Sequence, residues 1–117
     1  MDLVMRCVAV FLKADTAMEH VIFPAATVLL DLTASELCIE RVATLMHSLD
    51  LLPIVVDGAS RVLTEGGGGG SPRLRDLLIG IVLNLTCNVE DEAINKTLMD
   101  LEVVGVLCRY VARVNSY

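Results

Sequence analysis

The sequence predicts an all-α fold, on three observations. Hydrophobic residues make up 55% of the 117-residue chain, but aromatic residues only 3%. A core of mostly aliphatic side chains suits interdigitating helices better than sheets, which draw on Tyr, Phe and Trp. Apolar residues recur at helical spacing, and no segment shows the sustained two-residue alternation of a half-buried strand. The length suits one domain with a core of its own.

The first two helices are predicted from apolar stripes near the N-terminus. One stripe predicts a helix over residues 3–13, and a second stretch covers residues 17–33. Pro24 lies inside the second stretch. Because proline cannot donate a backbone hydrogen bond and clashes with the preceding turn, we expect this helix to kink or restart there.

Capping residues define the next two predicted helices. Ser35 resembles an N-cap for a helix that ends at Met46. Asp50 resembles the cap of a following helix over residues 51–63, which tolerates Pro53 because proline suits the first turn of a helix. The first part of the chain, before the glycines, is therefore expected to be helical almost throughout.

Three further helices are predicted after a run of glycines. A Ser-Pro pair caps and opens a helix over residues 72–86. Asn88, three residues before Asp91, resembles a capping box for the next helix. Asp100 then caps a last helix that ends near Val114. Each of these starts rests on a short polar side chain that can accept hydrogen bonds from free backbone N–H groups.

An internal repeat is the most informative feature of the sequence. The segments VLLDLTASELCIERVATLMHSLDLLPIVV and IVLNLTCNVEDEAINKTLMDLEVVGVL share an order of features: a helix ending in Leu-x-Leu-Thr, a short turn, an amphipathic helix and an apolar helix. The matched residues are Leu30, Leu32 and Thr33 with Leu83, Leu85 and Thr86, and, if one gap is allowed, Pro53 with Gly105. Repetition at such an interval indicates stacked helical units.

The repeated segments resemble armadillo repeats, whose units end their third helix on a Leu-x-Asn-Leu-like motif and open the next unit with two shorter helices. The resemblance covers nearly the whole chain and implies a right-handed α-α superhelix of about seven helices. In that scheme residues 3–13 are a second helix, 17–33 a third, 36–63 a first and second, and 72–86 a third. The chain then begins and ends with partial units. HEAT-like and other α-α superhelices are the alternatives.

The glycine run in VLTEGGGGGSPRLRD divides the chain into three parts. A phosphate-binding loop would lie between a strand and a helix, whereas these glycines follow one predicted helix and precede another. Glycine and serine form flexible coil, so we interpret residues 66–71 as a linker between armadillo-like helices in 1–65 and in 72–117. The linker is either a natural insertion or an engineered replacement for a longer loop. The engineered origin is favoured because no other low-complexity stretch occurs.

The charge and hydropathy of the sequence limit the classes of partner and the cellular location that we expect. The net charge is −6, and no cluster of Lys and Arg accompanies aromatic side chains. Nucleic acid is therefore not expected as a partner, whereas a basic segment of another protein would suit the charge. No uncharged run reaches the ~20 apolar residues of a membrane span, and the N-terminus does not resemble a signal peptide. We expect an intracellular, cytoplasmic protein, with the nucleus as the alternative compartment.

Catalytic or cofactor chemistry is not expected. His20 and His47 have no Cys or carboxylate at metal-ligand spacing, so no metal and no cofactor is predicted. No motif of nucleophilic or phosphate chemistry occurs, so we do not expect an enzyme. The four cysteines are widely spaced within apolar stretches, which predicts reduced, buried side chains. The acidic residues 90–92 are expected to form a solvated helix start.

The resemblance to armadillo repeats singles out four positions on the two third helices. In that family an Asn on this helix lines the concave groove and hydrogen-bonds the backbone of an extended peptide, and Asn84 matches it. A side-chain amide donates and accepts at once, although Asn84 could instead cap a neighbouring turn. Asp31 stands at the matching position of the earlier unit and could pair with Lys or Arg. Thr27 and Gly80 stand where the family has tryptophans, so we expect a shallow groove lined by Thr27, Asp31, Gly80 and Asn84.

The sequence leaves two main hypotheses of function. The first is a non-enzymatic scaffold module that binds a segment of a partner protein through this groove, with a basic segment as the one that suits the charge. The second is a structural subunit that completes its helical core by homo- or hetero-oligomerisation, because partial units at both ends expose apolar faces. A small helical protein with an apolar ligand cavity ranks below both, and an enzyme ranks last.

Overall fold

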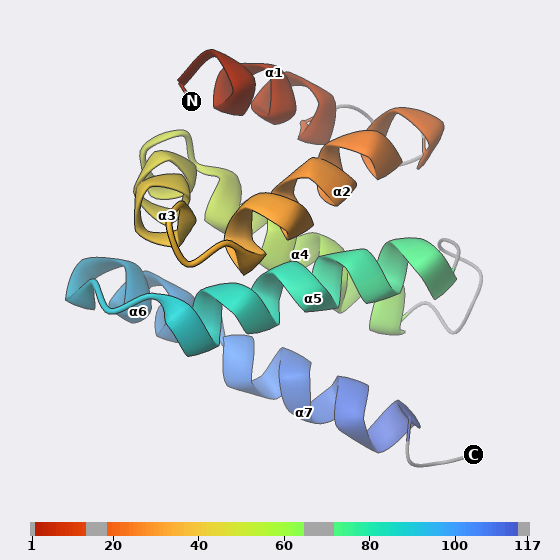
Figure 1. The fold of residues 1–117 in the computed structure, drawn as a ribbon. Coiled ribbons are helices and arrows are strands. Elements are labelled where there is room, and N and C mark those ends of the chain that lie inside the picture. The colour runs from red at the N-terminus through yellow and green to blue at the C-terminus, as the bar shows by residue number, and fades with distance from the viewer. Residues whose placement is uncertain (1, 14–18, 65–71, 115–117) are drawn as a thin grey trace.

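The computed structural model describes residues 2–13, 19–64 and 72–114, and all of its secondary structure is helical, as predicted. The predicted linker, residues 66–71, lies outside these residues. Figure 1 shows the arrangement of the helices. Their bounds are α1 Asp2–Leu12, α2 Glu19–Ala34, α3 Ile39–Ser48, α4 Leu51–Thr64, α5 Pro72–Asn88, α6 Glu92–Asp100 and α7 Val103–Val114.

Helix α2 runs through Pro24 without a restart, contrary to one of the two outcomes expected for this proline. The side chain of Pro24 is exposed, while its neighbours Ile22, Ala25 and Ala26 are buried in the core. Packing on both sides of the proline therefore holds the backbone in helix although one backbone donor is missing. Tertiary contacts override the local preference.

Helix α3 begins three residues later than its predicted start after Ser35. Residues 36–38 form a turn, in which the Ser35 carbonyl accepts the N–H of Cys38 at 3.1 Å and of Ile39 at 3.0 Å. Cys38 occupies the N-cap and makes no side-chain capping hydrogen bond. The prediction of Ser35 as N-cap is therefore wrong: the serine acts through its backbone carbonyl, and the helix starts at its first buried residue, Ile39.

Helix α6 is capped by Asp91, not by Asn88, which is instead the last residue of α5. The Asp91 Oδ1 accepts the backbone N–H of Ala93 at 2.9 Å and of Ile94 at 3.2 Å. Residues 90–92 are exposed, as expected for a solvated helix start. The predicted cap at Asp100 is also wrong, because Asp100 ends α6 and α7 begins three residues later.

Two turns of the chain have the same backbone geometry. Asp50, between α3 and α4, and Glu102, between α6 and α7, are the residues with a left-handed backbone among the non-glycine residues described, with φ of 57° and 61°. Each donates its N–H to a carbonyl three residues earlier, His47 for Asp50 and Met99 for Glu102. Their separation equals that of Pro53 and Gly105, so the one-gap alignment of the repeat is reproduced in the backbone.

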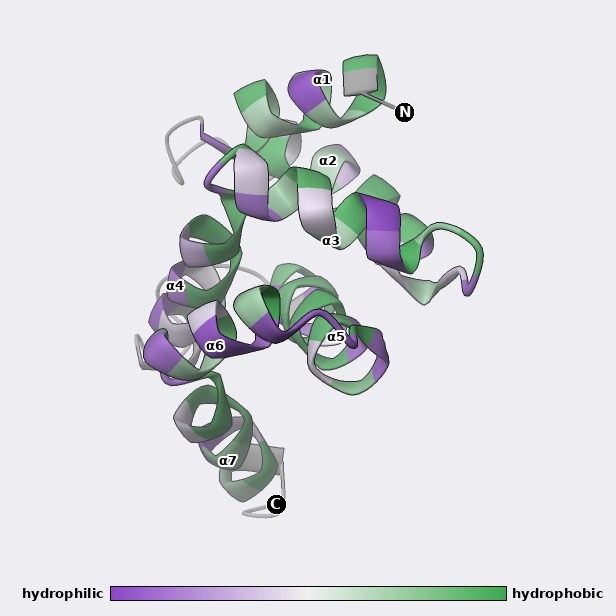
Figure 2. Ribbon diagram, turned by 90° about the vertical axis from the view of Figure 1, so that its left-hand side faces the viewer, coloured by the Kyte–Doolittle hydropathy of each residue, from purple (hydrophilic) through white to green (hydrophobic). Residues whose placement is uncertain are grey.

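Helices three places apart in the chain contact one another: α1 with α4, α2 with α5, α3 with α6, and α4 with α7. Helices that are adjacent or two places apart also contact, among them α1 with α2, α4 with α5, and α5 with α7. Figures 1 and 2 show α1 and α7 at opposite ends of the molecule, with α4 and α5 between them.

One aliphatic core runs through the described residues. Buried Leu, Ile, Val, Ala and Met side chains come from all seven helices, and the buried polar residue described is Thr33, whose Oγ1 donates to the Leu29 carbonyl at 2.7 Å. Thr86, its match in the repeat, makes the same bond to Val82.

No helix described is by itself long and apolar enough to cross a membrane; α3 with residues 51–61 of α4 passes that test only as a pair bent by 92°.

The predicted burial of the cysteines is wrong. Cys7, Cys87 and Cys108 are exposed, Cys38 is half-buried, and all four are free thiols. They lie in apolar stretches of sequence, but each helix buries only one stripe of its surface. The cysteines fall outside those stripes, which an apolar neighbourhood in sequence does not reveal.

The cap of α6 gives the first testable prediction. Asp91→Ala should lower the free energy of unfolding by about 1 kcal/mol, because two N–H groups lose their acceptor. Asp91→Asn keeps an acceptor and should cost much less. Urea unfolding followed by circular dichroism measures both, with Glu92→Gln as a control that changes charge but not the cap; equal losses for the Ala and Asn variants would contradict the assignment.

Candidate partner-binding surface

The four predicted groove residues lie on two helices that pack side by side. Thr27 and Asp31 belong to α2, and Gly80 and Asn84 belong to α5. Contacts between the helices follow the same order along both. They are Arg73 over the Phe23 ring at 4.9 Å, Gly80 against Leu30, and Asn84 on Thr33. Helices α2 and α5 are therefore parallel, and the structure brings the predicted positions onto neighbouring elements.

Asn84 joins α5 to the last turn of α2. Its Nδ2 donates to the Thr33 Oγ1 at 3.1 Å and lies 3.5 Å from the Leu30 carbonyl oxygen. The donor side of the amide thus serves the neighbouring turn, which was the alternative role expected for this residue. The Asn84 Oδ1 accepts no hydrogen bond from the residues that the structure describes, and the side chain is half-buried.

Gly80 permits the close approach of the two helices. A Cβ atom built at this position would lie 2.8 Å from the Leu30 Cδ1, closer than van der Waals contact allows. Gly105, which matches Pro53 in the repeat, is different, since nothing lies within 4 Å of a Cβ built there. Gly80 therefore has a packing role in addition to its predicted place in the groove.

Thr27 and Asp31 differ in how available they are to a partner. The half-buried Thr27 donates its Oγ1 to the Phe23 carbonyl at 2.9 Å, a bond within α2. Asp31 is exposed, and no described residue pairs with its carboxylate. Of the two, Asp31 offers a charge for recognition, while Thr27 offers chiefly a small surface.

An acidic cleft, which sequence reasoning missed, lies at the C-terminal ends of α2 and α5. Its volume is about 370 Å³, and its lining residues are Thr33, Ala34, Ser35, Glu36, Ile39, Glu40, Asn88 and Glu90. The Glu40 Oε1 accepts the Glu90 backbone N–H at 2.9 Å. Because Thr33 both lines the cleft and bonds Asn84, the cleft adjoins the α2–α5 surface. Glu40 lies on α3, and Glu36 and Glu90 lie just before α3 and α6, so the contact between these two helices brings the three residues to one cleft. In the sequence, only the internal repeat could have suggested that they lie near one another.

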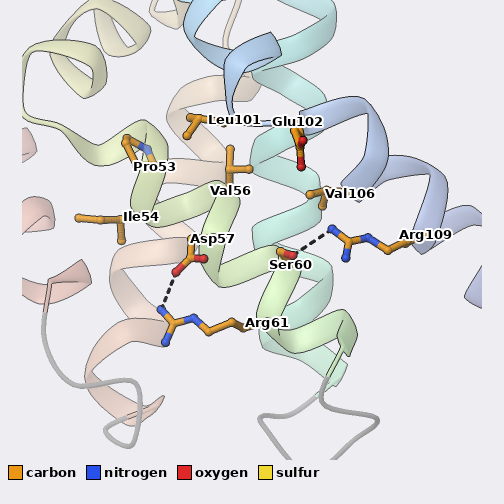
Figure 3. A pocket seen from close by; sticks show the side chains of 10 residues that line it. All are labelled: Pro53, Ile54, Val56, Asp57, Ser60, Arg61, Leu101, Glu102, Val106 and Arg109. Atoms are coloured by element: carbon orange, nitrogen blue, oxygen red, sulfur yellow. Dashed lines mark hydrogen bonds and ion pairs between the residues drawn. The ribbon is translucent and has the colours of Figure 1, made fainter.

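A second cleft lies between α4 and α7 (Figure 3). Its volume is about 520 Å³, with apolar side chains such as Val56 and Val106 on its walls. Among the polar groups at its rim, Arg61 pairs with Asp57 at 3.1 Å and Arg109 with the Ser60 hydroxyl at 3.0 Å.

The described residues hold no group of three or more His, Cys, Asp and Glu side chains that could bind a metal ion. His47 is exposed on α3, and the side chain of His20 lies outside the description. No family model, no curated protein and no solved structure matches this chain.

The close contact at Gly80 yields a prediction on stability. Gly80→Leu should lower the free energy of unfolding by about 1–3 kcal/mol, because the added side chain has to displace Leu30 between two packed helices. Gly105→Ala should raise it by about 0.5–1 kcal/mol, since the helix gains propensity and meets no neighbour. Thermal and urea unfolding of the two variants measure the difference, and a Gly80→Leu variant as stable as the parent would contradict the packing described.

Proposed function

We propose that this chain is a non-enzymatic protein-protein interaction module, built from armadillo-like stacked units, that binds an extended segment of a partner. The repeat of Asp50 and Glu102 and the stacking of each helix on the one three places later support such an arrangement. In this proposal α2 and α5 are successive third helices and carry the binding surface. A scaffold of this kind would act inside the cell, in the cytoplasm.

The surface formed by α2 and α5 carries the proposal. On this surface the half-buried Asn84 side chain has an Oδ1 that accepts no hydrogen bond from the described residues. Such an amide oxygen can accept a hydrogen bond from a backbone N–H of an extended peptide. Asp31 is exposed on the adjacent helix. A hydrogen bond between an amide side chain and the peptide backbone fixes the direction and register of the bound segment. The side chains of the segment can then form ion pairs with charged residues near the surface.

The charge of this surface favours a basic segment. The cleft that adjoins Asn84 presents Glu36, Glu40 and Glu90, and the chain as a whole has a net charge of −6. Helix α2 also points its C-terminus, the negative end of its dipole, toward this cleft. Lys or Arg side chains would therefore be attracted both over long range and at contact.

The second hypothesis, a subunit that completes its core by oligomerisation, is favoured by the exposed apolar side chains of the two end helices. They are Leu3, Val4, Val10 and Phe11 on α1, and Val104 and Val111 on α7. A subunit of this kind would show a mass and a melting temperature that rise with concentration. A steady monomer in light scattering would remove the homo-oligomeric form of this candidate, and the hetero-oligomeric form would need a partner chain of another kind.

Binding of a basic peptide tests the proposed function. A fluorescent Lys-Ser repeat of about ten residues, some 33 Å when extended, is titrated with the protein. Asp31→Lys should weaken binding about threefold to tenfold through charge reversal, and Asn84→Ala by a similar factor through the lost acceptor. Added salt should weaken binding to the parent protein as well.

Controls separate binding from stability. Asp100→Lys makes the same charge change on α6, outside the α2–α5 surface, and should leave the affinity within about twofold. Asn84→Ala should also lose about 1 kcal/mol of stability, because its bond to Thr33 disappears, so its helicity is checked at the temperature of the titration. Equal effects of Asp31→Lys and Asp100→Lys would mean that the peptide senses net charge alone, and the proposed surface would be wrong.

A further inference from the structure

The surface formed by α2 and α5 carries opposite charges at its two ends. The helices are parallel and run side by side toward α3 and α6 (Figure 1). At their C-terminal ends lies the acidic cleft with Glu36, Glu40 and Glu90. At the other end Arg73 stands in the first turn of α5, and its guanidinium lies 4.9 Å from the centre of the Phe23 ring of α2. The surface therefore has a cation where α5 begins and a group of anions where it ends.

The Arg73 guanidinium is in a position to bind an anion. The side chain is exposed, and no carboxylate of the described residues pairs with it. The next two charged residues of α5 differ, since Arg75 and Asp76 form an ion pair at 3.2 Å. A cation–π contact engages the face of a guanidinium and leaves its N–H groups available for hydrogen bonds. The Phe23 ring thus orders the Arg73 side chain without using the donors that a carboxylate would accept.

Arg73 lies in line with the two residues of α5 that belong to the α2–α5 surface. Gly80 follows Arg73 by seven residues and Asn84 follows it by eleven, which correspond to about two and about three turns of an α-helix. All three positions also meet α2. A segment that extends along this line from Asn84 would therefore reach Arg73 in one direction and the acidic cleft in the other.

The length of α5 sets the distance between the two charged ends. Arg73 and Asn88, which lines the acidic cleft, are fifteen residues apart, or ~22 Å along a helix that rises about 1.5 Å per residue. An extended chain covers about 3.3 Å per residue, so about seven residues span the same distance. A carboxylate and an ammonium with this separation in one segment can thus occupy both ends at once.

We propose that the α2–α5 surface binds a segment of mixed charge, with an acidic residue at Arg73 and basic residues at the acidic cleft, about seven residues away. The inference rests on the proposed function and adds an anchor of opposite charge to the basic one already described. The two anchors determine which end of the surface each charge of the segment occupies. A purely basic segment that extended as far would bring like charges together at Arg73, which is unfavourable.

Three fluorescent peptides of equal length test the inference. Each carries two lysines at one end in a Ser-Gly background. The first has a glutamate seven residues from the nearer lysine, and the second has glutamine at that position. The third also has the distant glutamine, and its glutamate stands two residues from the lysine. In anisotropy titrations with the full chain at low salt, the first peptide should bind about twofold to fivefold more tightly than the second, and the third more weakly than the second.

The sign of the effect separates the inference from net charge. Because the chain has a net charge of −6, overall electrostatics predict that an added glutamate weakens binding at either position. A local contact with Arg73 predicts a gain at the distant position and a loss at the near one. The comparison of the first and second peptides changes a single side chain of the peptide, so the background of weak contacts is the same in both.

Variants of the protein locate the anchor. Arg73→Glu should remove the advantage of the first peptide, and lysine in place of the distant glutamate of the peptide should restore binding to this variant. Arg73→Lys keeps the charge and should retain part of the advantage. Lys96→Glu makes the same charge change at an exposed position of α6, outside the surface, and should leave the preference for the first peptide unchanged. Circular dichroism checks that each variant keeps its helicity.

Two results would overturn the inference and leave the proposed function standing. One is a distant glutamate that weakens the binding of a peptide that the parent protein does bind. The other is a preference for the first peptide that Arg73→Glu and Lys96→Glu reduce equally, which would mean that Arg73 is not the anchor. If neither these peptides nor the Lys-Ser repeat bind saturably to the folded parent protein, the proposed function itself is wrong, and the inference falls with it.

Discussion

The contact between α2 and α5 is the constraint on which the rest of the structure depends. Gly80 eases their close approach, because a Cβ there would lie 2.8 Å from the Leu30 Cδ1 and that side chain would have to shift. The Asn84 amide then bonds the last turn of α2 through Thr33, the buried polar residue of the described core. One glycine and one amide thus contribute to the relative position of the two helices, and with it to the surface on which Asp31 lies and which the acidic cleft adjoins.

Helix existence could be predicted from the sequence more reliably than helix starts. Where several polar residues follow one another, as from Ser35 to Glu36 or from Asn88 to Glu92, each can cap, and local preference does not choose between them. In each case the observed cap lies within three residues before the first buried residue of the helix, Ile39 in α3 and Ile94 in α6. Burial of these residues, a property of packing, therefore contributes to the choice. Pro24 shows the same priority, since α2 continues through it with buried residues on both sides.

The candidate surface could be predicted only in part, for a related reason. Matching the repeats placed Asp31 and Asn84 on corresponding helices, and the two helices do pack together. The bond from Asn84 to Thr33 and the cluster of Glu36, Glu40 and Glu90 depend on how one unit sits on the next. The exposure of Cys7, Cys87 and Cys108 likewise depends on which stripe of each helix faces its neighbours. Such facts follow from tertiary geometry and leave little trace in a single sequence.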